Sequence, residues 1–346
     1  GNVNWITSGE LKEHYISDTK EKISEDAATA NNLKLLHPGT FVIAIYGLEA
    51  DGVRGTGSIT CKESTISQAC MAFTQKGDVK NEFLYSWYKK HGNIIGIKYA
   101  QGTKQQNLSY DILEKFHIAY PSQDEQDKLI KFISLLDERI ASQSKLIEKL
   151  ESLIKGIVDC TILRKEKNAI VGDVCSISEQ IRAEANIDDI ITVRLHGNGV
   201  CKSSAENLQL GATQYYRRRA GQLIYGKQNF HNGAIGIVPI SLDNGITSKD
   251  IPSFDIDEMK CNSVYLLAQL QSPQYYKPAE ALTTGTGSKR LKEETFLKLP
   301  IVLPNKREQD NIAVLIHRAS MNLDHAKRLL ELLSIQKQFL LRQMFI

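Results

Sequence analysis

The stretch YPSQDEQDKLIKFISLL at residues 120–136 is matched, 183 residues later, by LPNKREQDNIAVLIHRA at residues 303–319. Both stretches have a proline, then Glu-Gln four residues later, then apolar residues at the spacing of one helix face. Proline suits the turn before a helix, and acidic residues favour the positive end of the helix dipole. The sequence therefore predicts two long helices with equivalent entrances, and hence a duplicated structure.

The apolar pattern of the two helices predicts that they pack against each other. Apolar residues recur at steps of three and four along both, in matching register, which is typical of a coiled coil. Because each helix follows an equivalent domain, we expect an antiparallel pair with pseudo-twofold symmetry. The outer faces are rich in Lys, Glu and Gln, so we expect a docking partner to make mostly polar contacts there. The predicted helix seam consists of Leu129, Ile133, Leu136, Ile140, Ile147, Leu150, Ile154, Ile312, Ile316, Leu323, Leu330, Leu333 and Leu340.

A strand-rich module precedes each helix. Runs such as FVIAIYG at residues 41–47 and QLIYGKQ at residues 222–228 combine β-branched and aromatic residues with glycine. The predicted fold class is α+β: two strand-rich domains separated by an antiparallel coiled coil of two long helices, with a pseudo-twofold internal repeat. A leader at residues 164–189 has no counterpart before Trp5, so we expect a shortened N-terminus in the first module. The expected boundaries are 1–120 for the first domain, 121–164 for the first helix, 165–303 for the second domain and 304–346 for the second helix.

Composition narrows the functional classes. The net charge of +3 and the 24% of charged residues are ordinary for a globular protein. The chain has no apolar run of about 18 residues, so no membrane span is expected. The six scattered cysteines predict free thiols, so we expect a cytoplasmic protein without a metal site. The chain also has no P-loop motif and no Asn-Pro dipeptide, which argues against a motor or an adenine methyltransferase.

The chain resembles the specificity (S) subunit of type I restriction–modification systems. In the first half, the resemblance rests on LLHPGTFVIAIYG at residues 35–47 and GTKQQNLSYDILEKFHIAYPSQDEQDKLI at residues 102–130. In the second half, it rests on YGKQNFHNGAIGIVP at residues 225–239 and GTGSKRLKEETFLKLPIVLPNKREQDNIA at residues 285–313. The resemblance implies that the two modules are target-recognition domains, each reading one half of a split DNA sequence. It also implies that the long helices act as a spacer and a docking surface.

The same resemblance implies a non-catalytic subunit that carries no cofactor of its own. Its expected partners are double-stranded DNA, two methyltransferase subunits and restriction/translocase subunits. The methyltransferase subunits would use S-adenosylmethionine to methylate adenine N6, and the restriction subunits would add cleavage.

Candidate DNA-binding residues lie in two aligned loops before the helices, in a turn of the second module and in one basic cluster. Lys and Arg suit phosphates and guanine, whereas Asn and Gln suit adenine. The same side chains are common in solvated turns and on charged surfaces, so both interpretations stay open. The candidates are Gly102, Thr103, Lys104, Gln105, Gln106, Asn107, Arg217, Arg218, Arg219, Lys227, Gln228, Asn229, Ser288, Lys289 and Arg290.

A rival interpretation is a pseudo-dimeric coiled-coil scaffold or adaptor whose modules bind proteins without DNA specificity. The nearly neutral net charge suits that function. Salt dependence of duplex binding separates the two hypotheses, because affinity based on phosphate neutralisation falls steeply as salt rises.

Overall fold

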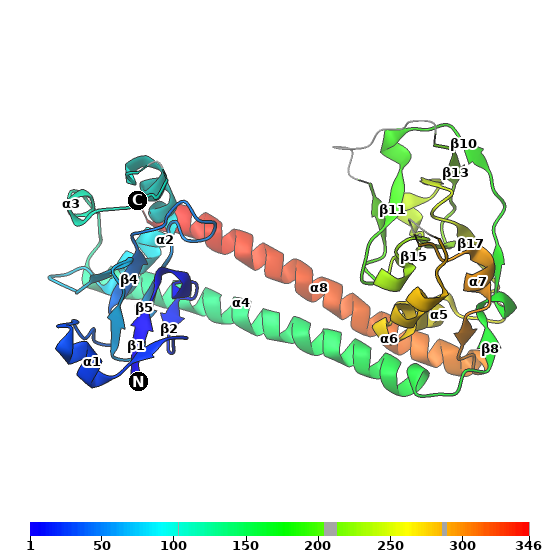
Figure 1. Ribbon diagram of the computed structural model, residues 1–346, viewed down its shortest axis with the longest axis horizontal. Coiled ribbons are helices and arrows are strands. Elements are labelled where there is room, and N and C mark those ends of the chain that lie inside the picture. The colour runs from blue at the N-terminus through cyan, green and yellow to red at the C-terminus, as the bar shows by residue number, and fades with distance from the viewer. Residues whose placement is uncertain (103, 204–212, 286–288, 346) are drawn as a thin grey trace. The chain divides into compact units, whose positions relative to one another are not determined.

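The computed structural model describes residues 1–102, 104–203, 213–285 and 289–345. The chain divides into two compact units (Figure 1). Unit 1 consists of Gly1–Ser144 with Arg328–Ile346, and unit 2 consists of Lys145–Lys327. Within the described ranges, every helix falls short of the length or the apolar character that a membrane crossing requires.

The two predicted long helices are α4 (Gln123–Val158) and α8 (Lys306–Met344), and each contributes one part to each unit. In unit 2, the Lys327 ammonium of α8 lies 2.8 Å from the Glu151 carboxylate of α4. Farther along α4, Val158 packs in one core with Ile312, which lies near the start of α8. Residue numbers rise along one helix as they fall along the other, so the helices run antiparallel in this unit.

Unit 1 shows the same arrangement for the other ends of the helices. Lys337 of α8 forms an ion pair with Asp137 of α4, and Leu340 packs in the same core as Leu129. None of the predicted seam positions is exposed in either unit. A π-helical turn at Asp159–Leu163 follows α4.

The repeated glutamine fixes each helix entrance to its own domain. Gln126 is 0% exposed. Its Oε1 accepts a hydrogen bond from the Lys80 backbone N–H at 2.9 Å, and its Nε2 donates to the carbonyl oxygens of Asp78 and Pro121, both at 3.0 Å. One amide thus ties the proline turn to the segment that leads into the earlier helix α2 (Asn81–Tyr99).

Gln309 makes the same three bonds in unit 2, where it is 1% exposed. Its Oε1 accepts from the Asn262 backbone N–H at 2.9 Å, and its Nε2 donates to the carbonyl oxygens of Lys260 at 3.1 Å and Pro304 at 2.8 Å. The motif recurs because both entrances need one buried group that accepts once and donates twice.

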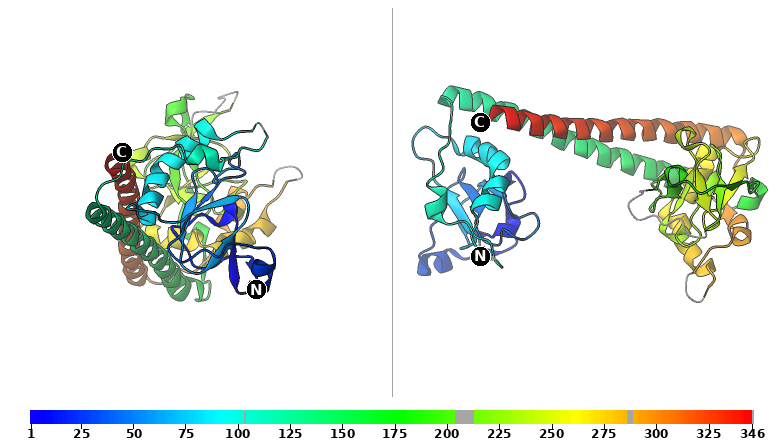
Figure 2. Two further views of the ribbon diagram at one scale, coloured as in Figure 1. Left: turned by 90° about the vertical axis from the view of Figure 1, so that its left-hand side faces the viewer. Right: turned by 90° about the horizontal axis from the view of Figure 1, so that it is seen from above.

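Unit 1 contains a four-stranded sheet in the order β2-β5-β4-β7 and a three-stranded sheet in the order β3-β1-β6. Helix α2 (Asn81–Tyr99) lies across the four-stranded sheet (Figure 2), where its Phe83 and Tyr88 are buried in one core with Phe41 of β4. The remaining elements of unit 1 are α1 (Glu25–Ala30), α3 (Tyr110–Leu113), β1 (Val3–Ile6), β2 (Tyr15–Ile16), β3 (Lys22–Ile23), β4 (Phe41–Ala44), β5 (Gly57–Thr60), β6 (Ser64–Ile66) and β7 (Cys70–Phe73).

Unit 2 contains sheets in the orders β15-β14-β17-β9, β10-β13-β16, β11-β12 and β18-β8. Its core holds Tyr225, Phe254 and Phe296, whose ring centroids lie 4.5 to 5.8 Å apart. The strands are β8 (Ala169–Ile170), β9 (Cys175–Ile177), β10 (Arg182–Ala183), β11 (Ile191–Val193), β12 (Val200–Lys202), β13 (Tyr215–Arg217), β14 (Leu223–Tyr225), β15 (Ile235–Ile237), β16 (Ile246–Ser248), β17 (Ser253–Ile256) and β18 (Pro300–Ile301). The helices are α5 (Ser263–Leu270), α6 (Pro273–Tyr276) and α7 (Glu293–Leu297).

The two units share a three-stranded antiparallel centre. β4 lies between β5 and β7 in unit 1, as β14 lies between β15 and β17 in unit 2. Gly39 and Gly221 stand two residues before β4 and β14 with φ of 84° and 85°, a left-handed conformation that glycine adopts without strain. The units differ at the sheet edge, because β9 pairs with β17 whereas β7 has no outer partner among the described residues. The predicted α+β class with an internal repeat is confirmed.

Candidate nucleic-acid interface

The two candidate loops before the long helices are closed in the same way. In unit 1, an antiparallel bridge joins Gln101 to Asn107. In unit 2, an antiparallel bridge joins Thr284 to Arg290, at positions 183 residues later. Each bridge brings the two ends of a short loop together.

The glycine of each loop serves the backbone. Gly102 and Gly285 have φ of 110° and 132°, where a side chain is strained. A Cβ at Gly102 would also lie 2.0 Å from the Gln105 carbonyl oxygen. Gly102 therefore shapes the turn and offers no side chain to a ligand. Two further candidates, Thr103 and Ser288, lie outside the described residues.

Part of the unit 1 loop is held by its own domain. The Gln106 backbone N–H donates to the Glu49 carboxylate at 2.8 Å, and this bond is the main reason why the pKa of Glu49 lies below its usual value. The Gln106 side-chain oxygen accepts from Arg54 at 2.7 Å, and the Asn107 side-chain oxygen accepts from the Gly47 N–H at 3.4 Å. The side-chain oxygens of Gln106 and Asn107 thus support the loop.

The unit 2 loop is held by ion pairs. Arg290 donates two hydrogen bonds to the Asp250 carboxylate, at 3.1 and 3.3 Å. Lys227 is 8% exposed, and its ammonium lies 2.6 Å from the Glu293 carboxylate. Both basic groups already have an acidic partner, so each has less positive charge to offer to a phosphate.

The remaining loop candidates are exposed. They are Lys104 and Gln105 in unit 1, and Gln228, Asn229 and Lys289 in unit 2. Unit 1 therefore presents a lysine and an amide on its bridged loop, whereas unit 2 presents a lysine on its bridged loop and two amides in the turn between β14 and β15. Lysine can neutralise a phosphate, and the amides can donate to and accept from a base edge.

The basic cluster divides between the surface and the interior. Arg217 and Arg219 are exposed, but Arg218 is 0% exposed. Its guanidinium donates to the hydroxyl oxygens of Thr247 at 2.7 Å and Ser253 at 3.0 Å. Burial lowers the pKa of Arg218 to about 10, so the group is still charged at neutral pH. Alternate residues of an extended segment face opposite sides, which turns the middle arginine inward. We correct the sequence-based assignment accordingly: Arg218 is a structural residue.

The acidic partners of the loops were not found from the sequence. Glu49 lies 57 residues before Gln106, and Asp250 lies 40 residues before Arg290. A lone carboxylate in a turn carries no signal of such a distant partner. Only the fold brings these groups together.

The outer faces of the helices differ from the expectation of a mostly polar surface. Several large apolar side chains on the two helices are exposed. In unit 1 these residues are Phe132, Leu135, Leu329, Leu332, Ile335 and Phe339. In unit 2 they are Leu146, Leu153, Val314, Leu315 and Met321.

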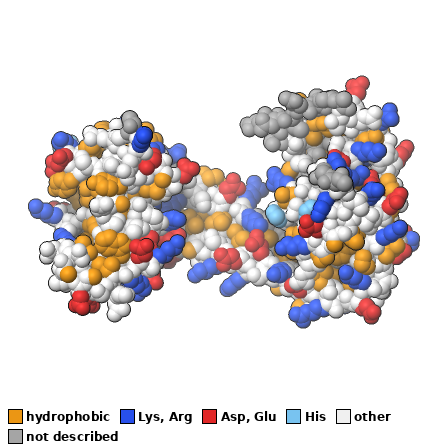
Figure 3. Space-filling view, in the orientation of Figure 1, with side chains coloured by type: hydrophobic (Ala, Val, Ile, Leu, Met, Phe, Trp, Pro, Cys, Tyr) orange, Lys and Arg blue, Asp and Glu red, His pale blue; other side chains and the backbone are white. Residues whose placement is uncertain are grey.

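Charge is dispersed on the face shown in Figure 3. Lys and Arg side chains are scattered over both units among acidic and hydrophobic ones, without one continuous basic field. A DNA contact on this face would therefore rest on a few local donors rather than on a broad positive surface.

Comparisons with known proteins show what the chain is similar to. Residues 1–152 match the model of the type I restriction modification DNA specificity domain. A stretch of 157 residues, 44% of this chain, is 27% identical to the type I restriction enzyme MjaIX specificity subunit of Methanocaldococcus jannaschii and spans 35% of that relative. The S subunit of the type I restriction–modification system of M. genitalium superposes with a TM-score of 0.65 at 14% identity, over 100% of this chain and 89% of that chain. At this identity the superposition shows the fold. The resemblance drawn from the sequence is confirmed.

Proposed function

We propose that this chain, whose residues 1–152 belong to the type I restriction–modification DNA specificity family, is the non-catalytic DNA-recognition subunit of a methyltransferase and restriction complex. It would read a bipartite target, one half through unit 1 and the other through unit 2. Each unit would present its loop before the long helix to one half-site. We place its action in the cytoplasm.

The single observation that carries the proposal is the pair of equivalently closed loops whose described residues carry different side chains. Both loops are closed by the same backbone bridge, and both glycines have positive φ. Among the described residues, the exposed side chains nevertheless differ: they are Lys104 and Gln105 in unit 1 and Lys289 in unit 2. A constant platform that holds variable hydrogen-bonding groups is what two readers of different base sequences need.

Docking of two methyltransferase subunits is the second part of the proposal. The exposed apolar side chains on α4 and α8 occur in both units, so each unit could bind one copy of the same partner. These partners would carry S-adenosylmethionine and transfer its methyl group to adenine N6. Restriction/translocase subunits would join the same complex for cleavage. The apolar positions support a protein partner because a helix face that meets only water has no need of them.

The testing experiment is methylation by the reconstituted complex. The purified chain is combined with its methyltransferase subunits and S-adenosylmethionine, and the modified adenines of a plasmid are mapped by sequencing. We expect methylation at one bipartite motif, and none when this chain is left out. Methylation that does not depend on the chain would contradict the proposal.

The scaffold hypothesis remains the second candidate, favoured by the net charge of +3 and by the dispersed basic residues in Figure 3. A scaffold without DNA specificity would bind duplexes weakly and without sequence preference. DNA recognition instead predicts that the affinity for the motif falls steeply and linearly on a log scale with salt, and that a scrambled duplex binds far more weakly.

A further inference from the structure

Gln106, in the bridged loop of unit 1, has all but one of its hydrogen-bonding groups occupied by its own domain. Its backbone N–H donates to the Glu49 carboxylate at 2.8 Å, and its backbone carbonyl oxygen accepts from the Leu48 N–H at 3.0 Å. Its side-chain oxygen accepts from the Arg54 guanidinium at 2.7 Å. The side-chain nitrogen remains, which is open to solvent and has no acceptor within the described residues.

The contact with Arg54 fixes which way the amide faces. A guanidinium carries donors only, so the amide atom that meets it must be the oxygen. A hydrogen bond from a charged donor is about twice as strong as one between neutral groups. Turning the amide over would lose this bond and set two donors against each other. The Gln106 side chain therefore presents its NH2 group, and no acceptor, away from Arg54.

Arg54 is itself held in place by helix α2. It belongs to the segment 45–56 between β4 and β5, and its Nε is buried. A Cβ at Gly96 of α2 would lie 2.5 Å from the Arg54 Cγ. The lack of a side chain at Gly96 thus leaves room for the arginine stem against the helix, and the guanidinium reaches Gln106 from a fixed position.

Asn107 has the same polarity. Its backbone N–H and carbonyl oxygen are both bonded to Gln101, each at 2.9 Å, and its side-chain oxygen accepts from the Gly47 N–H at 3.4 Å. Its side-chain nitrogen has no acceptor within the described residues and is not buried. Two consecutive amides of this loop therefore have their oxygens bonded to the domain and their nitrogens free to donate.

The equivalent position of unit 2 also carries a donor. By the shift of 183 residues, Gln106 corresponds to Lys289, which is exposed. An ammonium group donates and does not accept. A glutamine whose oxygen is occupied and a lysine thus stand at matching places, and both suit an acceptor on a ligand.

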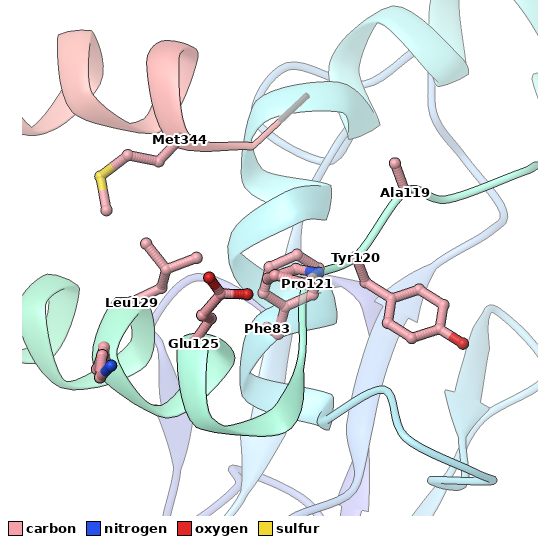
Figure 4. Close-up of a pocket in the computed structure, with 8 residues that line it drawn as sticks. Phe83, Ala119, Tyr120, Pro121, Glu125, Leu129 and Met344 are labelled. Atoms are coloured by element: carbon pink, nitrogen blue, oxygen red, sulfur yellow. The ribbon is translucent and has the colours of Figure 1, made fainter.

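A groove at the start of α4 is less selective (Figure 4). Apolar side chains such as Phe83 and Met344 line it, and so do Glu125 and Lys128. With one charge of each sign, the groove sets no preference between an acidic and a basic ligand. The loop amides, in contrast, have a single polarity.

A donor of this kind matches one base edge in the major groove. Guanine presents two neighbouring acceptors, N7 and O6, and one nitrogen with two hydrogens can donate to both. Adenine places its N6 donor beside N7, where it would meet the amide hydrogens, and thymine places a methyl group beside O4. Glutamine reads adenine through its oxygen and nitrogen together, and the Gln106 oxygen is bonded to Arg54.

We propose that Arg54 is a positioning residue that leaves Gln106 with a donor only, and that Gln106 thereby selects guanine in the half-site of unit 1. The inference rests on the proposed function, because it needs unit 1 to contact DNA through this loop. The Arg54 guanidinium keeps the Gln106 oxygen occupied, and the amide nitrogen donates to N7 and O6 of the base. The result is the opposite of the usual pairing of glutamine with adenine.

The test compares the base preferences of the reconstituted methyltransferase complex. A library of random duplexes is methylated by complexes of the unaltered chain, Gln106→Leu, Arg54→Met or Arg54→Lys, and the methylated molecules are sequenced. We expect Gln106→Leu to lower the preference for guanine about tenfold at one position of one block, because such a base contact contributes about 1–3 kcal/mol. The other block, read by unit 2, should be unchanged, and it shows that each variant complex is active.

Arg54→Met should free the Gln106 oxygen, so that the amide can also accept. We expect the preference for guanine over adenine at the same position to fall about tenfold, because adenine then meets both an acceptor and a donor. Arg54→Lys keeps a donor for the oxygen and should keep guanine. A merely structural role of Arg54 would instead lower the methylation of all sequences alike. The matched control is Lys62→Met, which removes a positive charge from an exposed position of unit 1 outside the loop and should leave the preference unchanged.

Modified duplexes separate a base contact from a phosphate contact. Replacing the selected guanine by 7-deazaguanine removes the N7 acceptor, which should weaken binding by the unaltered complex about fivefold and leave binding by the Gln106→Leu complex unchanged.

Three results would overturn the inference. They are a motif without a guanine that depends on Gln106, an equal loss on all sequences from Gln106→Leu, as expected for a phosphate contact, and an unchanged preference for guanine in Arg54→Met. Failure of the proposed function is distinct, because the complex would then methylate without a preferred sequence or without this chain.

Discussion

Unit 1 and unit 2 have the same helix entrance but differ in the strands that cover the neighbouring sheet edges. In both, a buried glutamine ties a proline turn to the domain, and three antiparallel strands form the centre. In unit 2, β8 and β9 cover the neighbouring edges, whereas in unit 1 those edges stay open within the described residues. The comparison separates what the fold requires, which recurs, from what each unit can vary, which lies at edges and loop tips.

A second difference lies inside the domains. Counting from the paired glycines, the position of Arg218 in unit 2 is held by Leu36 in unit 1. Both side chains are buried, Arg218 at 0% and Leu36 at 4% exposure. One unit fills this place with an apolar side chain and the other with a charged group that the surrounding oxygens satisfy. The same backbone position therefore supports two kinds of core.

The largest expected effect on stability comes from replacing Arg218 with leucine, the residue that unit 1 has at this position. Arg218→Leu removes the donors to Thr247 and Ser253 and leaves their environment polar. We expect the free energy of unfolding of unit 2 to fall by about 3 kcal/mol. Hydrogen exchange of unit 2 measures this directly. The neighbouring exposed Arg219→Leu should change it by less than about 0.5 kcal/mol, and equal effects of the two would contradict the buried role of Arg218.

The next largest effect concerns the paired glutamines. Gln126→Met and Gln309→Met each remove three buried hydrogen bonds, so each should lower the free energy of unfolding by about 2–3 kcal/mol. The two tryptophans, Trp5 and Trp87, both lie in unit 1, so their fluorescence reports the unfolding of that unit. Gln126→Met should shift the fluorescence transition more than Gln309→Met does. A larger shift from Gln309→Met would show that the entrances do not act within their own units.

A smaller effect is expected at the exposed lysines of the loops. Lys104→Ala and Lys289→Ala should each weaken binding to the cognate duplex by about 1 kcal/mol, roughly fivefold, and reduce the salt slope by about one. In the proposed bipartite scheme, each substitution affects contacts to a different half-site. Footprinting of each variant on the duplex distinguishes the halves. Lys149→Ala on α4, exposed but outside the loops, is the control and should bind like the unaltered chain.

The smallest expected effect is the difference in stability between losing one and losing the other of the two interhelical ion pairs. The side chains of Lys327 and Glu151 are 52% and 50% exposed, whereas those of Lys337 and Asp137 are 25% and 29% exposed. Solvent screens the first pair more strongly, so Lys327→Ala should lower the free energy of unfolding by at most about 0.5 kcal/mol and Lys337→Ala by about 1 kcal/mol. Urea denaturation followed by circular dichroism measures both. The reverse order would show that exposure does not govern these pairs.

Much of the fold could be predicted because its signals are local and repeated. The entrances at Pro121 and Pro304, the heptad spacing and the strand-forming runs are each visible in one stretch of sequence. Aligning the two halves of the sequence with a shift of 183 residues also predicted that the apolar positions of the two helices are in the same register. Leu129 and Ile312 illustrate this, because both reach the cores that their shared register predicts.

The candidate site was less predictable because its supports are distant in sequence. Nothing near Arg290 indicates that Asp250 will accept its hydrogen bonds, and nothing near Gln106 points to Glu49. The run of three arginines gave no sign that Arg218 turns inward, since that depends on strand pairing. The exposed apolar side chains on the helices were not predicted because the heptad pattern identifies only the residues of the seam.

The central claim is that two equivalent units of one chain read two halves of one DNA target. Its most direct test is selection from a library of random duplexes by the purified chain together with its methyltransferase subunits, followed by sequencing of the methylated molecules. The account predicts two short fixed blocks separated by a run of unspecified positions, with a methylated adenine in each block. A single uninterrupted motif, or methylation without any preferred sequence, would contradict it.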